Sequence, residues 1–357
     1  MSPTAIDNES VTSKPRQYLK SSGLLEQFEQ DHLTPIIGTE FPNAQLVDWI
    51  NAPNADALLH ELAVKISERG VVYFRKQDGL TNELQKKLIQ RLGELTGKPA
   101  SSGLHIHPVL HSDRELGGDD PEISTISSVA SAKVDSSHPS NPTTKKQSSA
   151  HWHTDIGFEP VPADYTSLRV TKMPKTGADT IWASGYEIYD RISKPYQRFL
   201  ESLTVTFAQP GFKKVSQASG YKLYDKQRGS PENVGTDYKA VHPVVRTNPV
   251  TGWKSIFPIG LHVEKINDVA EGESKALLDW FLGLIFENPD LQVRFRWKTP
   301  NDIAIWDNRS VFHTATYDLE GKWDRFGVRA VSCGEKPFFD PNSKSRREDL
   351  GEWISVV

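Results

Sequence analysis

The amino-acid sequence predicts an α+β protein with a mainly β core, a small barrel or jelly roll, with helices packed around it. Leucines at helical spacing dominate residues 58–95, whereas short segments with strand-like alternation dominate the chain from residue 168 onward. Histidines and an aspartate of the kind that bind metals lie next to the predicted strands, and the mouth of a barrel can hold a metal.

Two helices separated by a buried strand are predicted before residue 100. The first ends at Gly70, the strand covers residues 71–74, and Thr81 is expected to cap the second helix. Their apolar stripes are formed by Leu58, Leu59, Leu62 and Ile66 in the first helix and by Leu84, Leu88, Leu92 and Leu95 in the second.

The rest of the chain predicts strands at 168–171, 180–182, 241–246, 293–297 and 303–305, and helices at 186–203 and 273–286. With 357 residues, the chain is long enough for one large domain, which we expect to span residues 18–357 after a flexible tail at 1–17. The Ser-, Thr-, Lys- and Pro-rich stretch 126–150 predicts a long loop, which could act as a lid.

Composition excludes several classes of function. The net charge of −4 leaves no broad basic surface for nucleic acid or an anionic membrane. Cys333 is the only cysteine, which excludes an internal disulfide framework and fits a reducing compartment. No signal peptide or membrane-spanning run is present, so the sequence predicts a cytoplasmic protein, with a homo-oligomer as the usual default.

The most informative motif is His153-Thr154-Asp155, considered together with the distant His313. A His and an Asp two positions apart on a strand point the same way, and a second His can complete the set. Two imidazoles and one carboxylate are the ligands of a non-haem Fe(II) oxygenase. A His-x-Asp pair alone is weak, because an ordinary strand with two polar residues facing outward would look the same.

An iron held by three protein ligands can also bind a 2-oxo acid and O2. The far carboxylate of 2-oxoglutarate then needs a cation, and Arg gives a bidentate contact that Lys cannot reproduce. Arg325 and Arg329 follow His313 at a spacing that allows both to face the barrel, although two exposed arginines would fit the pattern equally well.

Longer stretches of the chain resemble the taurine dioxygenase family of Fe(II)/2-oxoglutarate-dependent dioxygenases, particularly its fungal sulfonate dioxygenases. The resemblance covers roughly residues 35–340, and its blocks keep a consistent order. The matching stretches are Leu104–Val109, Trp152–Asp155, Lys175–Ser184, His242–Val250 and Pro300–Arg309. The resemblance implies a double-stranded β-helix, a cupin-like jelly roll.

Carried over by position, the resemblance assigns most of an active site. It implies that His153, Asp155 and His313 bind Fe(II). It implies that Thr180 and Arg325 hold the distal carboxylate of 2-oxoglutarate, with O2 as the other co-substrate. The residues implied to contact the substrate are His107, Arg329 and Phe257. His105 and His151 are expected to support the site or to lie at its rim. No role is predicted for His111, His242 or His262.

The implied reaction is hydroxylation of the carbon next to a sulfonate, which releases sulfite and an aldehyde, with succinate and CO2 as co-products. Leu110, Ser149 and the segment 257–262 depart from the family pattern where the substrate would lie. The same machinery could therefore act on a small amino acid or another carboxylate, by hydroxylation, desaturation or cyclisation in secondary metabolism. A barrel that binds a ligand without catalysis, or an interaction scaffold, is the alternative from another class.

Overall fold

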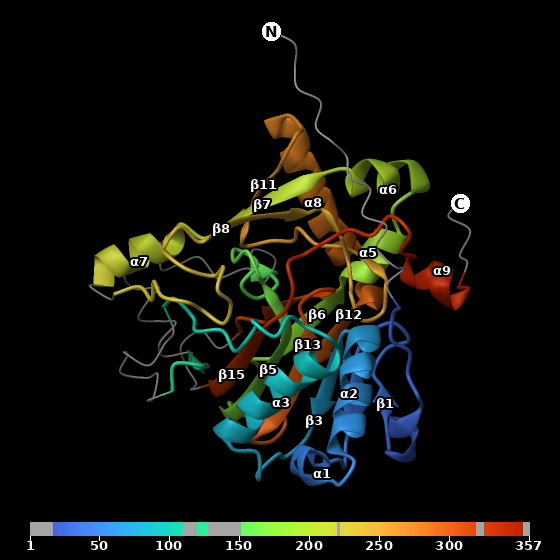
Figure 1. Cartoon of the computed structure of the whole chain (residues 1–357), viewed down its shortest axis with the longest axis vertical. Helices are drawn as coiled ribbons and strands as arrows, with labels where there is room; N and C mark the ends of the chain where they lie inside the picture. The colour runs from blue at the N-terminus through green and yellow to red at the C-terminus, as the bar shows by residue number, and fades with distance from the viewer. Residues whose placement is uncertain (1–16, 110–119, 128–150, 220–221, 319–324, 353–357) are drawn as a thin grey trace.

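The helices and strands come from a computed structural model that describes residues 17–109, 120–127, 151–219, 222–318 and 325–352 (Figure 1). The strands are β1 (Asp31–His32), β2 (Thr39–Phe41), β3 (Val71–Phe74), β4 (Ile123–Ser127), β5 (Ala163–Lys172), β6 (Thr180–Ser184), β7 (Thr204–Ala208), β8 (Lys239–Pro243), β9 (Val245–Thr247), β10 (Lys254–Ile256), β11 (Val263–Ile266), β12 (Gln292–Phe295), β13 (Asp302–Asp307), β14 (Val311–Ala315) and β15 (Phe326–Cys333). The helices are α1 (Leu46–Asn51), α2 (Ala55–Arg69), α3 (Asn82–Leu95), α5 (Gly185–Asp190), α6 (Lys194–Glu201), α7 (Gly211–Ser219), α8 (Glu271–Glu287) and α9 (Arg346–Leu350), with 3-10 turns at Leu24–Gln27 and Pro289–Leu291.

Two sheets form the centre of the molecule. The larger has seven strands in the order β1-β2-β3-β13-β5-β15-β4, antiparallel except for the parallel pair β2 and β3. A smaller sheet has the order β12-β6-β14. Two further sheets, β11-β7-β8 and β10-β9, extend from this core. The protein is therefore a sheet-rich α+β protein, as predicted.

Strand alternation explains how the sheets pack. In β13, Ile303 and Ile305 join the apolar cluster that includes α2 and α3, whereas Ala304 and Trp306 join the cluster that includes Trp182 of β6. Successive side chains of a strand point to opposite faces, so each strand of the large sheet contributes to both clusters. The large sheet is thus covered by helices on one face and by the small sheet on the other.

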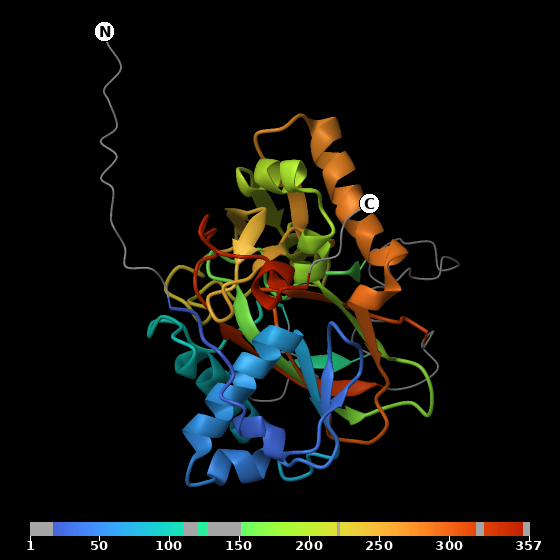
Figure 2. The same cartoon turned by 90° about the vertical axis from the view of Figure 1, so that its right-hand side faces the viewer.

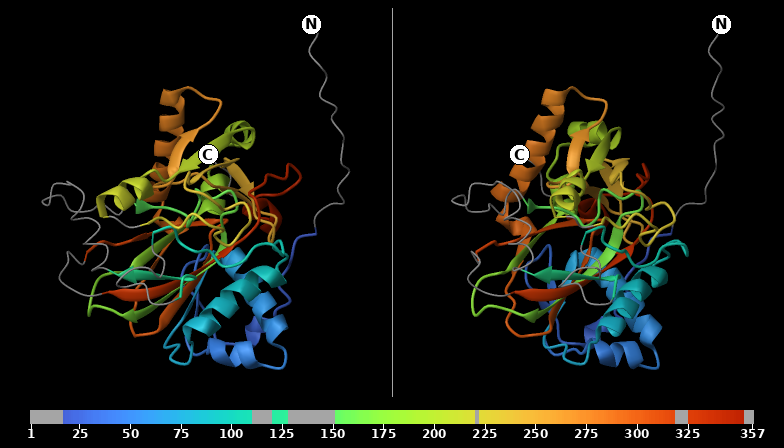
Figure 3. Two further views of the ribbon diagram at one scale, coloured as in Figure 1. Left: turned by 60° about the vertical axis from the view of Figure 1, so that its left-hand side comes forward. Right: turned by 90° about the vertical axis from the view of Figure 1, so that its left-hand side faces the viewer.

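The views agree on this arrangement. Helices α2 and α3 lie side by side across the large sheet (Figure 1), and α8 lies at the opposite end of the molecule (Figures 2 and 3). Among the described residues, no helix is long and apolar enough to cross a membrane. The predicted cytoplasmic location and homo-oligomer stay predictions.

Most of the predicted elements are confirmed, including both early helices, the strand at 71–74 and the helix at 273–286, which lies within α8. Gly70 has a φ of 75°, which suits a residue that ends a helix. The Thr81 hydroxyl accepts a hydrogen bond from the Leu84 backbone N–H at 3.2 Å, so it caps α3 as expected.

Three predictions of extent are wrong. The helix at 186–203 is two helices, α5 and α6, because Pro195 has no N–H and its ring would clash with the carbonyl of Arg191 in a continuous helix. The strand at 241–246 divides into β8 and β9 just after Pro243, which cannot donate to a ladder. The strand predicted at 293–297 is β12, which ends at Phe295. Residues 126 and 127 complete β4, whereas 128–150 lie outside the described residues.

Candidate metal and 2-oxoglutarate site

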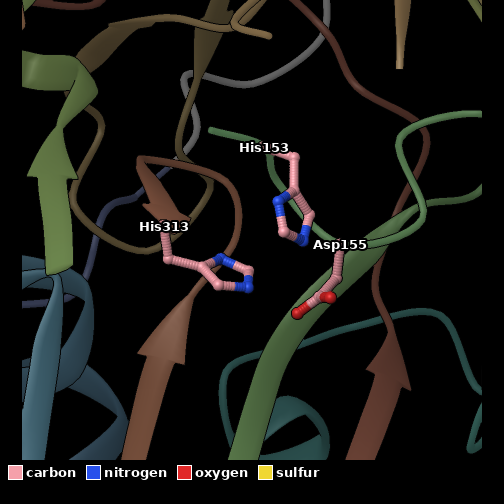
Figure 4. A group of neighbouring side chains, drawn as sticks. All are labelled: His153, Asp155 and His313. Atoms are coloured by element: carbon pink, nitrogen blue, oxygen red, sulfur yellow. The ribbon is translucent and has the colours of Figure 1, made fainter. Parts of the chain in front are cut away.

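The structure brings His153, Asp155 and His313 together (Figure 4). The backbones of His153 and His313 exchange two hydrogen bonds, at 3.1 and 2.9 Å, which attach the segment before β5 to β14. One potential ligand atom from each of the three residues lies within 4.8 Å of the others. The contact between residues 153 and 313 is therefore made by strand-like antiparallel pairing.

Hydrogen bonding selects the nitrogen that His153 can offer. Its Nδ1 lies 2.7 Å from the carbonyl oxygen of His151, so Nδ1 carries the proton and Nε2 is available as a ligand. Burial lowers the pKa of His153, and it lowers the pKa of His313 to about 3. Both imidazoles are neutral at physiological pH, which is the state that binds a metal.

Asp155 is held from its backbone and from its side chain. Its backbone N–H donates to Asn308 Oδ1 at 3.0 Å, and its Oδ1 accepts from Arg329 Nη1 at 2.6 Å. Burial alone would raise the pKa of this carboxyl, but the charge of Arg329 and smaller contributions from neighbouring groups together outweigh burial, and the pKa falls to about 2. Asp155 is therefore ionised at neutral pH.

The donor set fits a divalent iron. Asp155 Oδ2 is buried and has no hydrogen-bond partner among the residues that the structure describes. A buried carboxylate oxygen without a partner is costly, and a bound cation removes that cost. Two neutral imidazoles and one carboxylate on one side, with no further protein ligand in this cluster of described residues, leave coordination positions for other molecules.

Thr180 and Arg325 are also brought together. Thr180 Oγ1 accepts from Arg325 Nη2 and from the indole N–H of Trp297, each at 3.2 Å. With two donors facing this oxygen, the hydroxyl proton of Thr180 is free to point toward a ligand. Burial lowers the pKa of Arg325 to about 10, so the guanidinium stays charged at neutral pH. Trp297 was not singled out from the sequence.

His107 follows a segment that pairs with β15, the strand that contains Arg329. Arg329 lies within this strand, and the backbone N–H of His105 donates to the carbonyl of Val331, two residues further on. His107 Nδ1 accepts from the Val109 backbone N–H at 3.1 Å, so its proton is on Nε2. His107 and Arg329 are each only 9% exposed, as residues of an enclosed site would be.

His105 supports this segment from behind. Its Nε2 lies 3.0 Å from Glu159 Oε1, and Arg228 binds the same carboxylate through Nε at 2.6 Å and Nη2 at 2.8 Å. All three side chains are almost completely buried. The expected supporting position of His105 agrees with this geometry, although nothing in the sequence indicated Glu159 or Arg228 as partners.

The surroundings of Phe257 and His262 differ from what was expected of these two residues. Phe257 is 1% exposed and packs against Phe207 and His242, inside an apolar cluster. Its role in binding substrate stays a prediction. In contrast, the ring of His262, for which no role was predicted, lies 5.7 Å from that of His153. Leu110 and Ser149, the departures expected near the substrate, lie outside the described residues.

Comparison with known proteins decides the family. The family described as "Taurine catabolism dioxygenase TauD, TfdA family" matches residues 29–331. The chain belongs to this family. It is therefore an Fe(II)- and 2-oxoglutarate-dependent dioxygenase, with O2 as its other co-substrate.

Relatives within the family span nearly the whole chain. The alpha-ketoglutarate-dependent dioxygenase btcD of Neocamarosporium betae is 51% identical over 341 residues, covering 93% of this chain and 98% of the relative. The alpha-ketoglutarate-dependent dioxygenase oryG of Aspergillus oryzae is 48% identical, covering 93% of this chain and 95% of the relative. An alpha-ketoglutarate-dependent sulfonate dioxygenase of Saccharomyces cerevisiae is 31% identical, covering 88% and 69%.

Solved structures share the fold of this family member. A taurine dioxygenase from Burkholderia xenovorans has a TM-score of 0.62 at 23% identity, covering 88% of this chain and 92% of that one. AAD-2 in complex with Mn(II) and N-oxalylglycine has a TM-score of 0.61 at 20% identity, covering 87% and 99%.

Proposed function

We propose that this dioxygenase oxidises a small anionic substrate, a sulfonate, at the carbon next to its anionic group. The observation that carries the proposal is the position of Arg329, whose guanidinium touches Asp155 in the His153–Asp155–His313 cluster. An anion bound to the other side of this guanidinium would lie beside the metal. The relative from Saccharomyces cerevisiae is named a sulfonate dioxygenase, which supports the choice of anion.

In this proposal, His153, Asp155 and His313 hold Fe(II), and the two facing sheets form a double-stranded β-helix around it. The bound iron, with 2-oxoglutarate and O2, supplies the oxidation and yields succinate and CO2. The surrounding residues keep the two imidazoles neutral and the carboxylate ionised, which are the states that bind a metal. The orphaned Asp155 Oδ2 supports this assignment.

Arg329 and His107 would bind the sulfonate. A sulfonate is a permanent anion with three acceptor oxygens, and burying it requires fixed positive charge and hydrogen-bond donors. Arg329 Nε is buried and has no hydrogen-bond partner among the described residues, so it retains a donor for such an oxygen. His107 adds a donor through its protonated Nε2.

The proposed outcome follows from where the hydroxyl group is added. When the carbon that bears the sulfonate becomes hydroxylated, the C–S bond breaks and sulfite leaves with the bonding electron pair. The hydroxyl loses its proton as the C–O bond becomes a carbonyl, which gives an aldehyde. Arg329 would hold the departing sulfite as it held the sulfonate.

Sulfite release tests the proposed substrate class. With purified enzyme, Fe(II), 2-oxoglutarate and O2, we expect sulfite and succinate to form in equal amounts on at least one member of a panel of small alkanesulfonates. Succinate formed on a small amino acid or another carboxylate, without sulfite from any sulfonate, would contradict the sulfonate assignment. That result would favour the carboxylate alternative, which Arg329 supports because it already binds a carboxylate in Asp155.

Thr180 and Arg325 would bind the distal carboxylate of 2-oxoglutarate. Replacing Arg325 with Lys keeps the charge but removes the planar fork, which costs about one charge-assisted hydrogen bond, or about 1.5–3 kcal/mol. We expect the KM for 2-oxoglutarate to rise about 10- to 100-fold with a smaller change in kcat. A matched control is Arg294→Lys. Arg294 lies on β12, which pairs with the strand that contains Thr180, but its side chain binds Asp179 and is half-exposed. Equal KM values in both variants would contradict the role of Arg325.

A further inference from the structure

His262 is a buried histidine beside the proposed iron ligands that the chemistry above leaves unused. Its side chain is 8% exposed, and its ring stands almost perpendicular to that of His153, at 86° and a centroid distance of 5.7 Å. Phe158 packs edge-on against it at 5.2 Å. A polar ring in this position needs partners for both of its nitrogens.

The backbone around His262 is fixed to the metal cluster. The Leu261 N–H donates to the carbonyl of Trp152, the residue before His153, at 2.9 Å. Gly260 has a φ of 74°, and a Cβ there would lie only 1.8 Å from the same carbonyl oxygen. The Ala208 N–H donates to the carbonyl of His262 at 2.8 Å. His262 is therefore held next to His153 from both sides and has little freedom to move away.

Gln209 determines the tautomer of His262. The amide oxygen of Gln209 accepts from the Gly211 backbone N–H at 3.2 Å, so its amide nitrogen is the atom that faces His262. That nitrogen lies 3.1 Å from His262 Nδ1 and must donate to it. In this hydrogen-bond network Nδ1 is an acceptor, and the proton of the neutral ring is on Nε2.

Among the residues that the structure describes, none accepts a hydrogen bond from His262 Nε2–H. The only hydrogen bond that this ring makes within the described residues is the one through Nδ1. A bound substrate that covers this donor without offering an acceptor leaves it unpaired, which is unfavourable. A substrate that offers an acceptor at this point would remove that cost.

We propose that His262 is a specificity-determining residue that donates from Nε2 to a second acceptor group of the substrate. This inference rests on the proposed function and deepens it. Arg329 and His107 bind the anionic end, whereas His262 selects anions that also carry a hydroxyl or carbonyl oxygen. A substrate with an alkyl group at this point leaves Nε2–H unpaired. A substrate with an ammonium group there places a second hydrogen-bond donor against Nε2–H. Both substrates are therefore disfavoured.

Matched substrates test this selectivity. In one series, the probes are ethanesulfonate, 2-hydroxyethanesulfonate and 2-aminoethanesulfonate; in the other, they are butanoate, 3-hydroxybutanoate and 3-aminobutanoate. Succinate formation gives kcat/KM, and the shift of the charge-transfer band of the anaerobic Fe(II)/2-oxoglutarate enzyme gives the affinity. We expect the hydroxylated member of the accepted series to be favoured about 10-fold by both readouts.

Two variants separate a hydrogen bond from packing. His262→Phe fills the space without a donor, so the preference for the hydroxylated member should vanish. His262→Gln restores an N–H group and should recover part of it. His242→Phe is the matched control, because His242 is also buried but donates to the carbonyl of Gly157, and its replacement should leave the preference unchanged.

The outcomes distinguish this inference from the proposed function. If no sulfonate releases sulfite, sulfonate oxidation is overturned, and the butanoate series then decides the role of His262. If the wild-type enzyme prefers the unsubstituted or amino member, or if His262→Phe leaves the preference unchanged, the inference is overturned. If neither series binds or reacts, the inference is overturned together with the proposed anion site.

Discussion

Replacing His153 with Ala should abolish substrate-dependent succinate formation. Nε2 of His153 is the ligand that its Nδ1 hydrogen bond to the His151 carbonyl leaves available. Removing a partner that only orients a metal ligand typically costs 10- to 100-fold, so removing a ligand should cost more than about 100-fold. Anaerobic Fe(II) titration should show a parallel loss of affinity, and an unchanged Tm of the metal-free protein separates loss of the ligand from misfolding.

His151 provides a matched control two residues away. It is also a partly buried histidine, but its contribution to His153 comes from its backbone carbonyl, which any residue retains. His151→Ala should therefore leave Fe(II) affinity unchanged and turnover within about threefold of the wild-type value, well short of the loss expected for a ligand or its orienting partner. Unchanged turnover in His153→Ala would refute the metal cluster, and equal losses in both variants would point to a general effect of the segment.

The metal cluster could be predicted from the sequence because its chemistry is concentrated in few residues. His153 and Asp155 lie two apart, so a strand-like backbone alone brings them to one side. His313 could be predicted from its place after a strand and from the family resemblance. Arg325 and Arg329 could be singled out in the same way, and their roles in binding 2-oxoglutarate and substrate stay predictions.

The supporting contacts could not be predicted, because they join residues that no local pattern relates. Trp297 reaches Thr180 from the segment that follows β12, and His262 is held near His153 where Gly260 comes close to Trp152. These contacts depend on the path of the chain in three dimensions. Gly260 is the one signal that could have been noticed, since a glycine flanked by large apolar residues indicates a tight backbone approach.

The division of the predicted helix at 186–203 has a different cause. Pro195 was visible in the sequence, but the apolar spacing on either side of it suggested one helix. The two short helices bury residues of one apolar cluster in common, among them Ile188 and Leu200. Apolar periodicity therefore reported the buried face correctly and missed the break in the backbone.

In the proposed site, Arg329 would link the metal-binding and substrate-binding ends more closely than the sequence suggested. Its guanidinium binds Asp155 through Nη1, while Nε stays unpaired among the described residues. One cation can therefore stabilise the ionised metal ligand and a substrate anion together. Since both anions share this charge, a substrate that binds Arg329 is held beside the metal without a separate positioning element.

The other large effect is expected at Asn308, a buried residue that carries no proposed chemistry. Its Oδ1 accepts from the Asp155 backbone N–H and from the indole N–H of Trp306, at 3.0 and 3.1 Å. Its Nδ2 donates to Thr166 Oγ1 at 2.8 Å and to the Asp164 carbonyl at 3.2 Å. Asn308 thus joins the backbone of Asp155 to β5 and β13.

Asn308→Leu would remove the side-chain partner of all four groups, of which the Asp164 carbonyl keeps the backbone N–H of residue 308 as a donor at 2.8 Å. Each buried polar group left unpaired costs about 1–3 kcal/mol, and the costs are not additive, so we expect a loss of at least about 3 kcal/mol in the free energy of unfolding. Thermal unfolding should show a Tm lower by at least about 4 °C, the shift that 3 kcal/mol gives in a chain of 357 residues. Asn51→Leu, at an exposed position, should change stability by less than about 0.5 kcal/mol.

Asn308→Asp separates the structural role of this side chain from its effect on the metal. It keeps both acceptor contacts, loses the two N–H donors and adds a negative charge beside Asp155. We expect a smaller loss of Tm than in Asn308→Leu. If Fe(II) affinity falls in both variants while Tm stays unchanged, the network does not stabilise the fold and acts only by orienting Asp155. If Tm falls and Fe(II) affinity does not, the position of Asp155 is fixed by Arg329 instead, because Arg329 is the other group that holds this carboxylate.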